Sequence, residues 1–243
     1  MTLDQNKPSP ARVGTRLRSL LGVSLAFGLA YGLSNNLTSL REDVGAGVFA
    51  WERAIPFVPW TIVPYLSICG FYALSFFVER DRVELQRHVT RLLLALGIAL
   101  VCYAACPLRF TFQRPATEGL VGLLFQGLAA FDLPYNRAPS LHIVVLLLLW
   151  VRLKPHAAGW QRAALDLWFL LIAASVLTTY QHHVINVPAG FAVGALCIAL
   201  TSRRRGVFLR GLWGVLKPIT AIRLSHRLLT VSTPASVAQR VGP

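Results

Sequence analysis

Five residues suited to phosphate chemistry lie in three short segments of this chain of 243 residues. They are Arg109 and Arg114 in the first segment, Ser140 and His142 in the second, and His182 in the third. An arginine guanidinium carries a permanent charge and a planar fork of donors, which suits the oxygens of a phosphate group. An imidazole can attack phosphorus or pass a proton to a leaving oxygen. These residue types predict phosphoryl transfer if the fold brings the three segments together.

Each group has its own role in that reaction. The two arginines are expected to bind phosphate. Pro139 suits the first turn of a helix, so Ser140 and the backbone N–H groups after it would face an anion at the helix N-terminus. We expect His182 to attack phosphorus and His142, one turn into the helix, to protonate the leaving oxygen. The predicted intermediate is a phosphohistidine, and the reaction requires neither a metal nor another cofactor.

The composition predicts that these residues are positioned by membrane helices. Only 14% of the residues are charged, against about 25% in soluble domains, and the mean hydropathy is +0.56. The formal net charge of +14 is compatible with binding to nucleic acid or to an anionic membrane surface, and the hydrophobicity favours the membrane. The four cysteines lie in apolar runs without a metal-binding spacing. We therefore predict an all-α integral membrane protein that does not bind nucleic acid.

Six apolar runs predict six transmembrane helices. The runs cover residues 18–36, 56–78, 90–108, 140–153, 165–182 and 186–202. Of the 24 Lys and Arg residues, 19 fall in the two tails and the even-numbered connections, and five fall in the odd-numbered connections. By the positive-inside rule, both termini face the cytoplasm. The three segments with phosphate chemistry then share the outward face.

This topology divides the chain into four parts. They are a cytoplasmic tail over 1–17, the first two transmembrane helices over 18–89, a four-helix core over 90–202 and a basic tail over 203–243. The basic tail either binds anionic lipids of the inner leaflet as an amphipathic helix or remains a floppy extension. The apolar segment 119–131 is too short to span, and we expect it to form a wall of a lipid groove or a buried re-entrant turn. Gly190 and Gly194 predict close packing of the sixth helix on a neighbour.

The ordered motifs resemble those of the type 2 phosphatidic acid phosphatase superfamily, particularly its inositol-phosphorylceramide-synthase-like branch. Arg114-Pro115 is similar to part of the first family motif, and Pro139-Ser-Leu-His142 to the second. The segment 175–186 is similar to the third, which assigns the family's nucleophile to His182. The resemblance covers residues 100–202 and implies a phosphatidic-acid-phosphatase-type helical core that acts on a lipid phosphate.

One departure from the family pattern concerns phosphate binding. Val176 stands where the wider family has an arginine, directly after the serine of the third motif. Arg109 or Arg137 could supply the missing charge, so both are candidate phosphate-binding residues.

A second departure concerns the nucleophile. Asn186 stands where the family has the aspartate that orients the nucleophilic histidine. An amide oxygen accepts the same hydrogen bond but does not stabilise an imidazolium as a carboxylate does, and the analogous change in a serine protease costs about 10⁴ in rate. Either Asp132 or Glu118 compensates for this change, or the chain is nearly inactive.

These features together predict a lipid phosphatase of the bacterial inner membrane, with its site facing the periplasm or the exterior and a membrane lipid phosphate as its substrate. Two alternatives keep the same chemistry: a polyprenyl diphosphate phosphatase, and a phosphotransferase that moves a lipid head group. A third alternative, favoured by Asn186, is a catalytically impaired protein that binds lipid phosphate.

Overall fold

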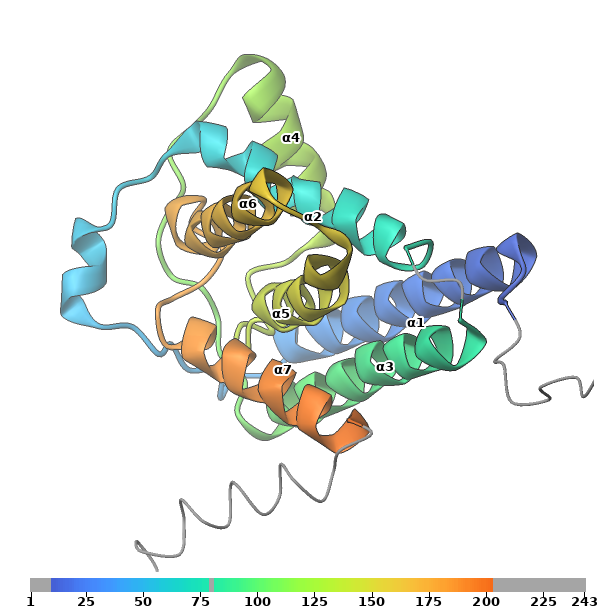
Figure 1. Ribbon diagram of the computed structural model, residues 1–243. Helices are drawn as coiled ribbons and strands as arrows, with labels where there is room; N and C mark the ends of the chain where they lie inside the picture. The colour runs from blue at the N-terminus through green and yellow to red at the C-terminus, as the bar shows by residue number, and fades with distance from the viewer. Residues whose placement is uncertain (1–9, 79–80, 203–243) are drawn as a thin grey trace, which may run out of the picture. The chain divides into compact units, whose positions relative to one another are not determined.

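The structure is a computed structural model that describes residues 10–78 and 81–202. Its regular elements in these ranges are helices (Figure 1). The α-helices are α1 (Val13–Ser39), α2 (Ile62–Ser75), α3 (Arg82–Ala105), α4 (Gly119–Phe131), α5 (Leu141–Leu153), α6 (Trp160–Thr178) and α7 (Asn186–Thr201). Single 3-10 turns are η1 (Ala50–Ala54), η2 (Pro59–Thr61) and η3 (Lys154–His156). The all-α prediction is confirmed for this part of the chain, and the predicted basic tail over 203–243 lies outside it.

Three helices, α1, α3 and α6, are long and apolar enough to cross a membrane. The helices α2, α5 and α7 coincide with the other three predicted spans but have 14, 13 and 16 residues. These lengths fall short of the roughly 20 residues that a span needs. Prolines shorten two of them, because Pro59 begins a separate 3-10 turn before α2 and Pro155 lies in another directly after α5. Length and composition thus support three spans, and six spans remain a prediction.

Side-chain caps fix where two of the helices begin. The carboxylate of Asp81 accepts the N–H of Val83 at 2.8 Å, and α3 follows. The hydroxyl of Ser140 accepts the N–H of Ile143 at 3.4 Å, and α5 follows. Each cap satisfies a backbone donor that has no partner within its helix. The second cap places the start of α5 beside the candidate site.

The helix α5 lies at the centre of the bundle, where it contacts α2, α3, α6 and α7 (Figure 1). Its contact with α7 is close, as the glycine spacing predicts. A Cβ atom on Gly190 would lie 2.7 Å from the carbonyl oxygen of Ser140, and one on Gly194 would lie 3.0 Å from Leu147 Cδ2. The first turns of α5 and α7 are therefore held together.

The first two helices pack directly on the helices of the predicted core. The helix α1 packs along α3, while α2 packs on α5 and α6. All belong to one compact unit, Met1–Thr201. Sequence reasoning treated these helices as an addition to the core, but the structure gives them a share in the candidate site.

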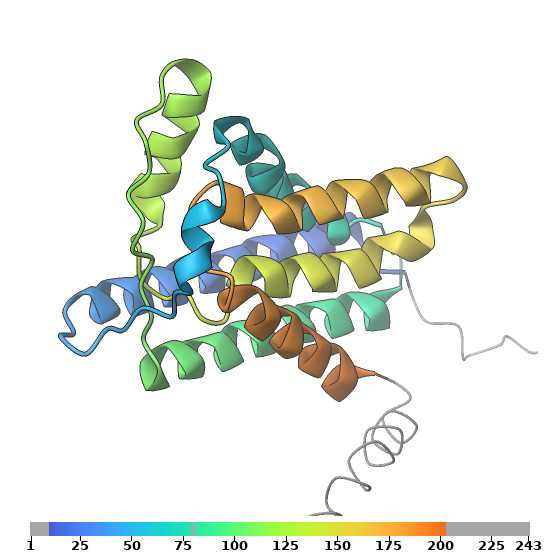
Figure 2. The ribbon, with the colours of Figure 1, turned by 90° about the vertical axis from the view of Figure 1, so that its left-hand side faces the viewer.

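The helix α4 lies across the end of the bundle rather than along it (Figure 2). Leu120, Leu123 and Phe131 of this helix are exposed. Phe125, on another face, is buried against Phe57 at a ring distance of 5.6 Å. This exposed face differs from a buried re-entrant turn, and a groove wall at the outer interface remains a prediction.

Candidate functional site

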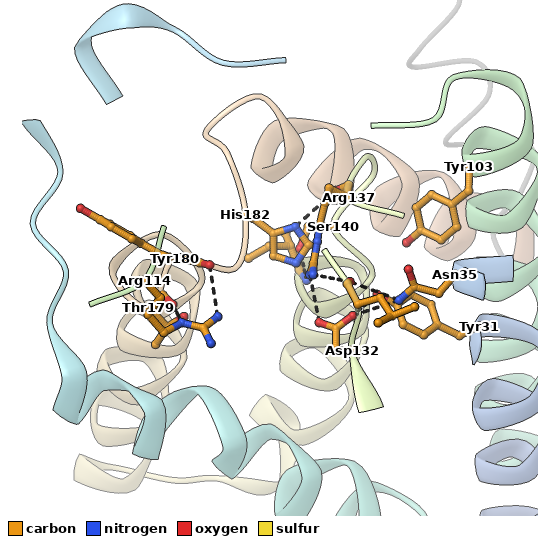
Figure 3. Close-up of polar contacts among 12 residues, drawn as sticks. Tyr31, Asn35, Tyr103, Arg114, Asp132, Arg137, Ser140, Thr179, Tyr180 and His182 are labelled. Atoms are coloured by element: carbon orange, nitrogen blue, oxygen red, sulfur yellow. Dashed lines mark hydrogen bonds and ion pairs between the residues drawn. The ribbon is translucent and has the colours of Figure 1, made fainter. Parts of the chain in front are cut away.

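The three segments with phosphate chemistry meet where α4, α5 and α7 have their ends (Figure 3). The backbone N–H of Ser140 donates to the carbonyl oxygen of Asn186 at 3.1 Å. The Nε of Arg114 donates to the carbonyl oxygen of Thr179 at 3.2 Å. Hydrogen bonds thus link the connection before α5 to the start of α7, and the connection before α4 to the end of α6.

His182 is held by a backbone carbonyl. Its Nδ1–H donates to the carbonyl oxygen of Arg137 at 3.2 Å, and the side chain is buried (Figure 3). This bond fixes the tautomer, so the lone pair is on Nε2. His182 lies in the connection after α6, where burial, and next the charge of Arg137, lower its pKa well below the ordinary value of 6.5. The imidazole is therefore neutral, as a nucleophile must be.

Arg137 is anchored by Asp132 and through it by α1. The Nη1 of Arg137 lies 2.9 Å from Asp132 Oδ2, and the pair is largely buried. The other carboxylate oxygen accepts the hydroxyl of Tyr31 at 2.8 Å and the amide of Asn35 at 3.3 Å (Figure 3). Two side chains of α1 therefore fix the connection that supplies the carbonyl partner of His182.

Arg114 lines a small cavity. Its Nε and Nη2 donate to the carbonyl oxygens of Thr179 and Tyr180, at 3.2 and 3.4 Å. Its Cζ lies 4.6 Å from the centroid of the Phe125 ring, a cation–π contact. The cavity has a volume of ≈ 250 Å³, and Arg137 also lines it. Arg114 and Arg137 therefore line one space that is large enough for a phosphate-sized anion, and Arg137 also donates to Asp132 and to the carbonyl oxygen of Leu133.

His142 and His182 line a second, larger cavity of ≈ 570 Å³. The ring of His142 stacks on Tyr65 with centroids 4.1 Å apart. Its Nε2 is buried and has no hydrogen-bond partner among the described residues. Asp132 lines both cavities, so the phosphate-sized cavity and the larger one adjoin at this carboxylate.

Four candidate residues do not join this arrangement. Ser140 is buried, its hydroxyl accepts the N–H of Ile143 as the cap of α5, and it is not among the residues that line either cavity. Arg109 is exposed and is not among the residues that line either cavity, whereas Phe110, Phe112 and Arg114 of the same connection line the smaller one. Asn186 is buried, but its side-chain nitrogen and oxygen have no partner in the described part of the chain. Glu118 is exposed at the start of α4. Of the two carboxylates expected to compensate for Asn186, Asp132 alone is near, and it pairs with Arg137.

Sequence reasoning missed the partner of the second histidine. The Nδ1–H of His183 donates to Glu52 Oε2 at 2.8 Å, and its Nε2 accepts the backbone N–H of Thr111 at 3.3 Å. Glu52 also accepts the backbone N–H groups of Val184 and Phe49, at 3.2 and 3.0 Å. An isolated acidic residue in an apolar stretch is a sign of such a role, but no spacing connects Glu52 to a residue 131 positions later.

No group of three His, Cys, Asp or Glu side chains that could hold a metal ion occurs among residues 10–78 and 81–202. Two arginines and two histidines line the two adjoining cavities. No family model matches the chain, and no curated protein matches it. The site must therefore be interpreted from its own geometry and from the motif resemblance.

Proposed function

We propose that the chain is a bacterial inner-membrane enzyme that cleaves the phosphate ester of a lipid through a phosphohistidine on His182. In this proposal six helices cross the membrane, both termini are cytoplasmic and the site faces outward. The observation that carries the proposal is the hydrogen bond from His182 Nδ1 to the carbonyl oxygen of Arg137. It holds the imidazole in the larger cavity, which adjoins the smaller cavity lined by Arg114 and Arg137 at Asp132. It gives a neutral nucleophile of one tautomer next to a site for an anion.

The reaction has two steps. In the first, His182 Nε2 attacks phosphorus, the bond from phosphorus to the lipid oxygen breaks, and His142 protonates that oxygen. His142 receives this proton from the monoanionic phosphate when the substrate binds. In the second step, His142 takes a proton from water, the resulting hydroxide attacks phosphorus, and the bond from phosphorus to His182 breaks. His142 then passes its proton to the departing phosphate, which leaves as the monoanion and restores the neutral imidazole.

In this proposal the arginines and the start of α5 stabilise the negative charge of the transition state. Arg114 and Arg137 face the phosphate-sized cavity and would bind the oxygens that carry charge in the transition state. The N-terminal N–H groups of α5 after Ser140 would add to this, because helix N-termini favour anions. The motif resemblance to lipid phosphatases supports the same assignment of roles.

The direct test is to trap the phosphoenzyme. The full chain in detergent is mixed with phosphatidate labelled with ³²P in its phosphate and quenched in alkali, in which phosphohistidine survives. We expect radioactivity on the protein, and its loss in His182→Gln. Label that persists in that variant would contradict the assigned nucleophile.

A matched pair of arginine variants tests phosphate binding. Arg114→Ala should raise KM for phosphatidate more than tenfold, because it removes a permanent charge from the cavity. Arg109→Ala, in the same connection but exposed, should change KM less than twofold. Equal effects of the two substitutions would contradict the assigned phosphate site.

The identity of the substrate is tested with three lipids. Phosphate release from phosphatidate or phosphatidylglycerophosphate agrees with a glycerolipid phosphatase. Release from undecaprenyl diphosphate alone would overturn this choice in favour of a polyprenyl diphosphate phosphatase. A phosphoenzyme that turns over only when a second lipid alcohol is added would identify a phosphotransferase.

Asn186 favours a second candidate function, a lipid-phosphate binder with little activity. The partner of His182 is a neutral carbonyl, so no carboxylate stabilises an imidazolium there. If the chain is an impaired enzyme and a carboxylate at position 186 replaces the Arg137 carbonyl as the partner of His182 Nδ1, Asn186→Asp should raise turnover strongly. No turnover in either version, with phosphatidate binding retained, would favour the binder.

A further inference from the structure

The larger cavity has an elongated apolar wall. On α1 its lining extends from Ser24 to Gly32, which are eight steps apart, or about 12 Å of helix. Facing residues come from α2, between Tyr65 and Tyr72, and from the last turn of α4. The membrane hydrocarbon core is about 30 Å thick, so this length corresponds to somewhat less than one leaflet.

The polar groups of this cavity gather at one end. His142, His182 and Asp132 line it beside the candidate phosphate site, at the level where Tyr31 binds Asp132. Ser24, two helical turns earlier in α1, donates its hydroxyl to Tyr72 Oη at 3.3 Å. The cavity therefore has a reactive polar end, an apolar middle and a polar contact at its far end.

Two glycines keep the middle of the cavity open. A Cβ atom added to Gly28 or Gly32 would meet no atom within 4 Å, and both residues line the cavity. Larger residues at these positions would place their side chains in the cavity. Gly22, on the same helix, is equally free of neighbours but is not among the lining residues. A substitution at Gly22 is therefore a matched control for substitutions at Gly28 and Gly32 that fill the cavity.

We infer that this cavity binds one acyl chain of a glycerolipid, and that Gly28 and Gly32 determine which chains are accepted. The inference rests on the proposed function, because the phosphate of the same lipid must reach His182. The apolar middle, continuous with the two histidines, fits a hydrocarbon chain whose head group lies at the site. The length of about 12 Å is sufficient for part of an acyl chain, and competition between phosphatidate and polyprenyl phosphate distinguishes the two kinds of chain.

Chain binding can be measured without turnover. The full chain in nanodiscs is irradiated with phosphatidate that carries a diazirine on its acyl chain, and labelled peptides are identified by mass spectrometry. We expect labels on residues 24–32 and 65–72, also in the His182→Gln variant. Gly28→Leu should reduce this labelling at least fivefold, whereas Gly22→Leu should leave it unchanged. Equal labelling in both glycine variants would overturn the inference.

Chain selectivity provides the second measurement. Gly28→Leu should lower kcat/KM for a dipalmitoyl substrate more than tenfold and for a dibutyryl substrate less than threefold. Gly28→Ala, with a smaller side chain, should give an intermediate effect and guards against a folding defect in the leucine variant. An equal loss of kcat/KM for both substrates would overturn the inference. So would photolabelling that unlabelled polyprenyl phosphate suppresses and unlabelled phosphatidate does not. Labelling at the expected residues without any phosphate release would refute the proposed function and leave the chain site standing.

Discussion

The Nδ1–H of His182 donates to the backbone carbonyl oxygen of Arg137 at a distance of 3.2 Å. A carboxylate that orients a nucleophilic histidine does two things: it fixes the tautomer and it stabilises the imidazolium. A carbonyl does the first and contributes little to the second. Fixing the tautomer and stabilising the imidazolium are therefore separate effects at this site, and substitutions around His182 should affect them differently.

Replacing Asn186 by alanine should change turnover less than tenfold. Its side-chain atoms have no partner among the described residues, so the substitution does not release the tautomer of His182. The measurement is kcat with phosphatidate, with circular dichroism as a check of folding. A loss near the 10⁴ seen when a triad carboxylate becomes an amide would mean that Asn186 orients the histidine after all.

The convergence of the site could be predicted, because each motif lies at the end of an apolar run and the connections alternate between membrane faces. His182 and Ser140 belong to this predictable part. The partner of His182 could not be predicted, because the backbone path over 132–140 is fixed by Tyr31 and Asn35, about 100 residues earlier. Arg109 and Arg114 lie in the same connection and have the same side chain. The backbone path of that connection decides that Arg114 lines the smaller cavity and Arg109 is exposed.

The protonation of His182 can be followed directly by NMR. Burial and the nearby charge of Arg137, with His142 and His183 also close, lower its pKa well below 6.5. In protein whose histidines are isotope-labelled, the His182 ring should therefore stay neutral at pH 6, where a free histidine is mostly charged. The signal that disappears in His182→Gln is that of His182. The folded state disfavours protonation of His182, whereas the unfolded state allows it. The contribution of His182 to the free energy of unfolding should therefore fall as the pH drops below about 6.5. A ring that titrates near 6.5 would contradict this environment.

The contact between Tyr31 and Asp132 should contribute more to stability than an ordinary hydroxyl bond. Tyr31→Phe removes a bond to a carboxylate and should cost about 2 kcal/mol. Tyr103→Phe removes a bond to the neutral carbonyl oxygen of Pro139 and should cost about 1 kcal/mol. Chemical unfolding in detergent measures both. In an Asp132→Asn background the cost of Tyr31→Phe should fall towards that of Tyr103→Phe, and an unchanged cost would mean that the carboxylate is not involved.

The buried contact between Glu52 and His183 should stabilise the connections that carry these two residues. Glu52→Gln replaces one carboxylate oxygen by a donor, so at least one of the N–H groups that Glu52 accepts loses its acceptor. The expected cost is about 2 kcal/mol of unfolding free energy. Asp43→Asn, in the exposed pair with Arg41, should cause no measurable change. If the two variants unfold alike, the contact is not a stabilising one.

The close approach of α5 and α7 is the feature that keeps Ser140 beside Asn186. Gly190→Ala places a methyl group 2.7 Å from the Ser140 carbonyl oxygen and 2.9 Å from Ile143 Cβ, where backbone must move to accept it. We expect a loss of about 1–3 kcal/mol in stability, together with a fall in kcat, because the first turn of α5 shifts away from His182. Gly97→Ala in α3 has no atom within 4 Å of the added carbon and should not reduce stability, since alanine is the better helix former. Thermal unfolding and turnover are measured on both variants. Full activity in Gly190→Ala would show that the site does not depend on this helix contact.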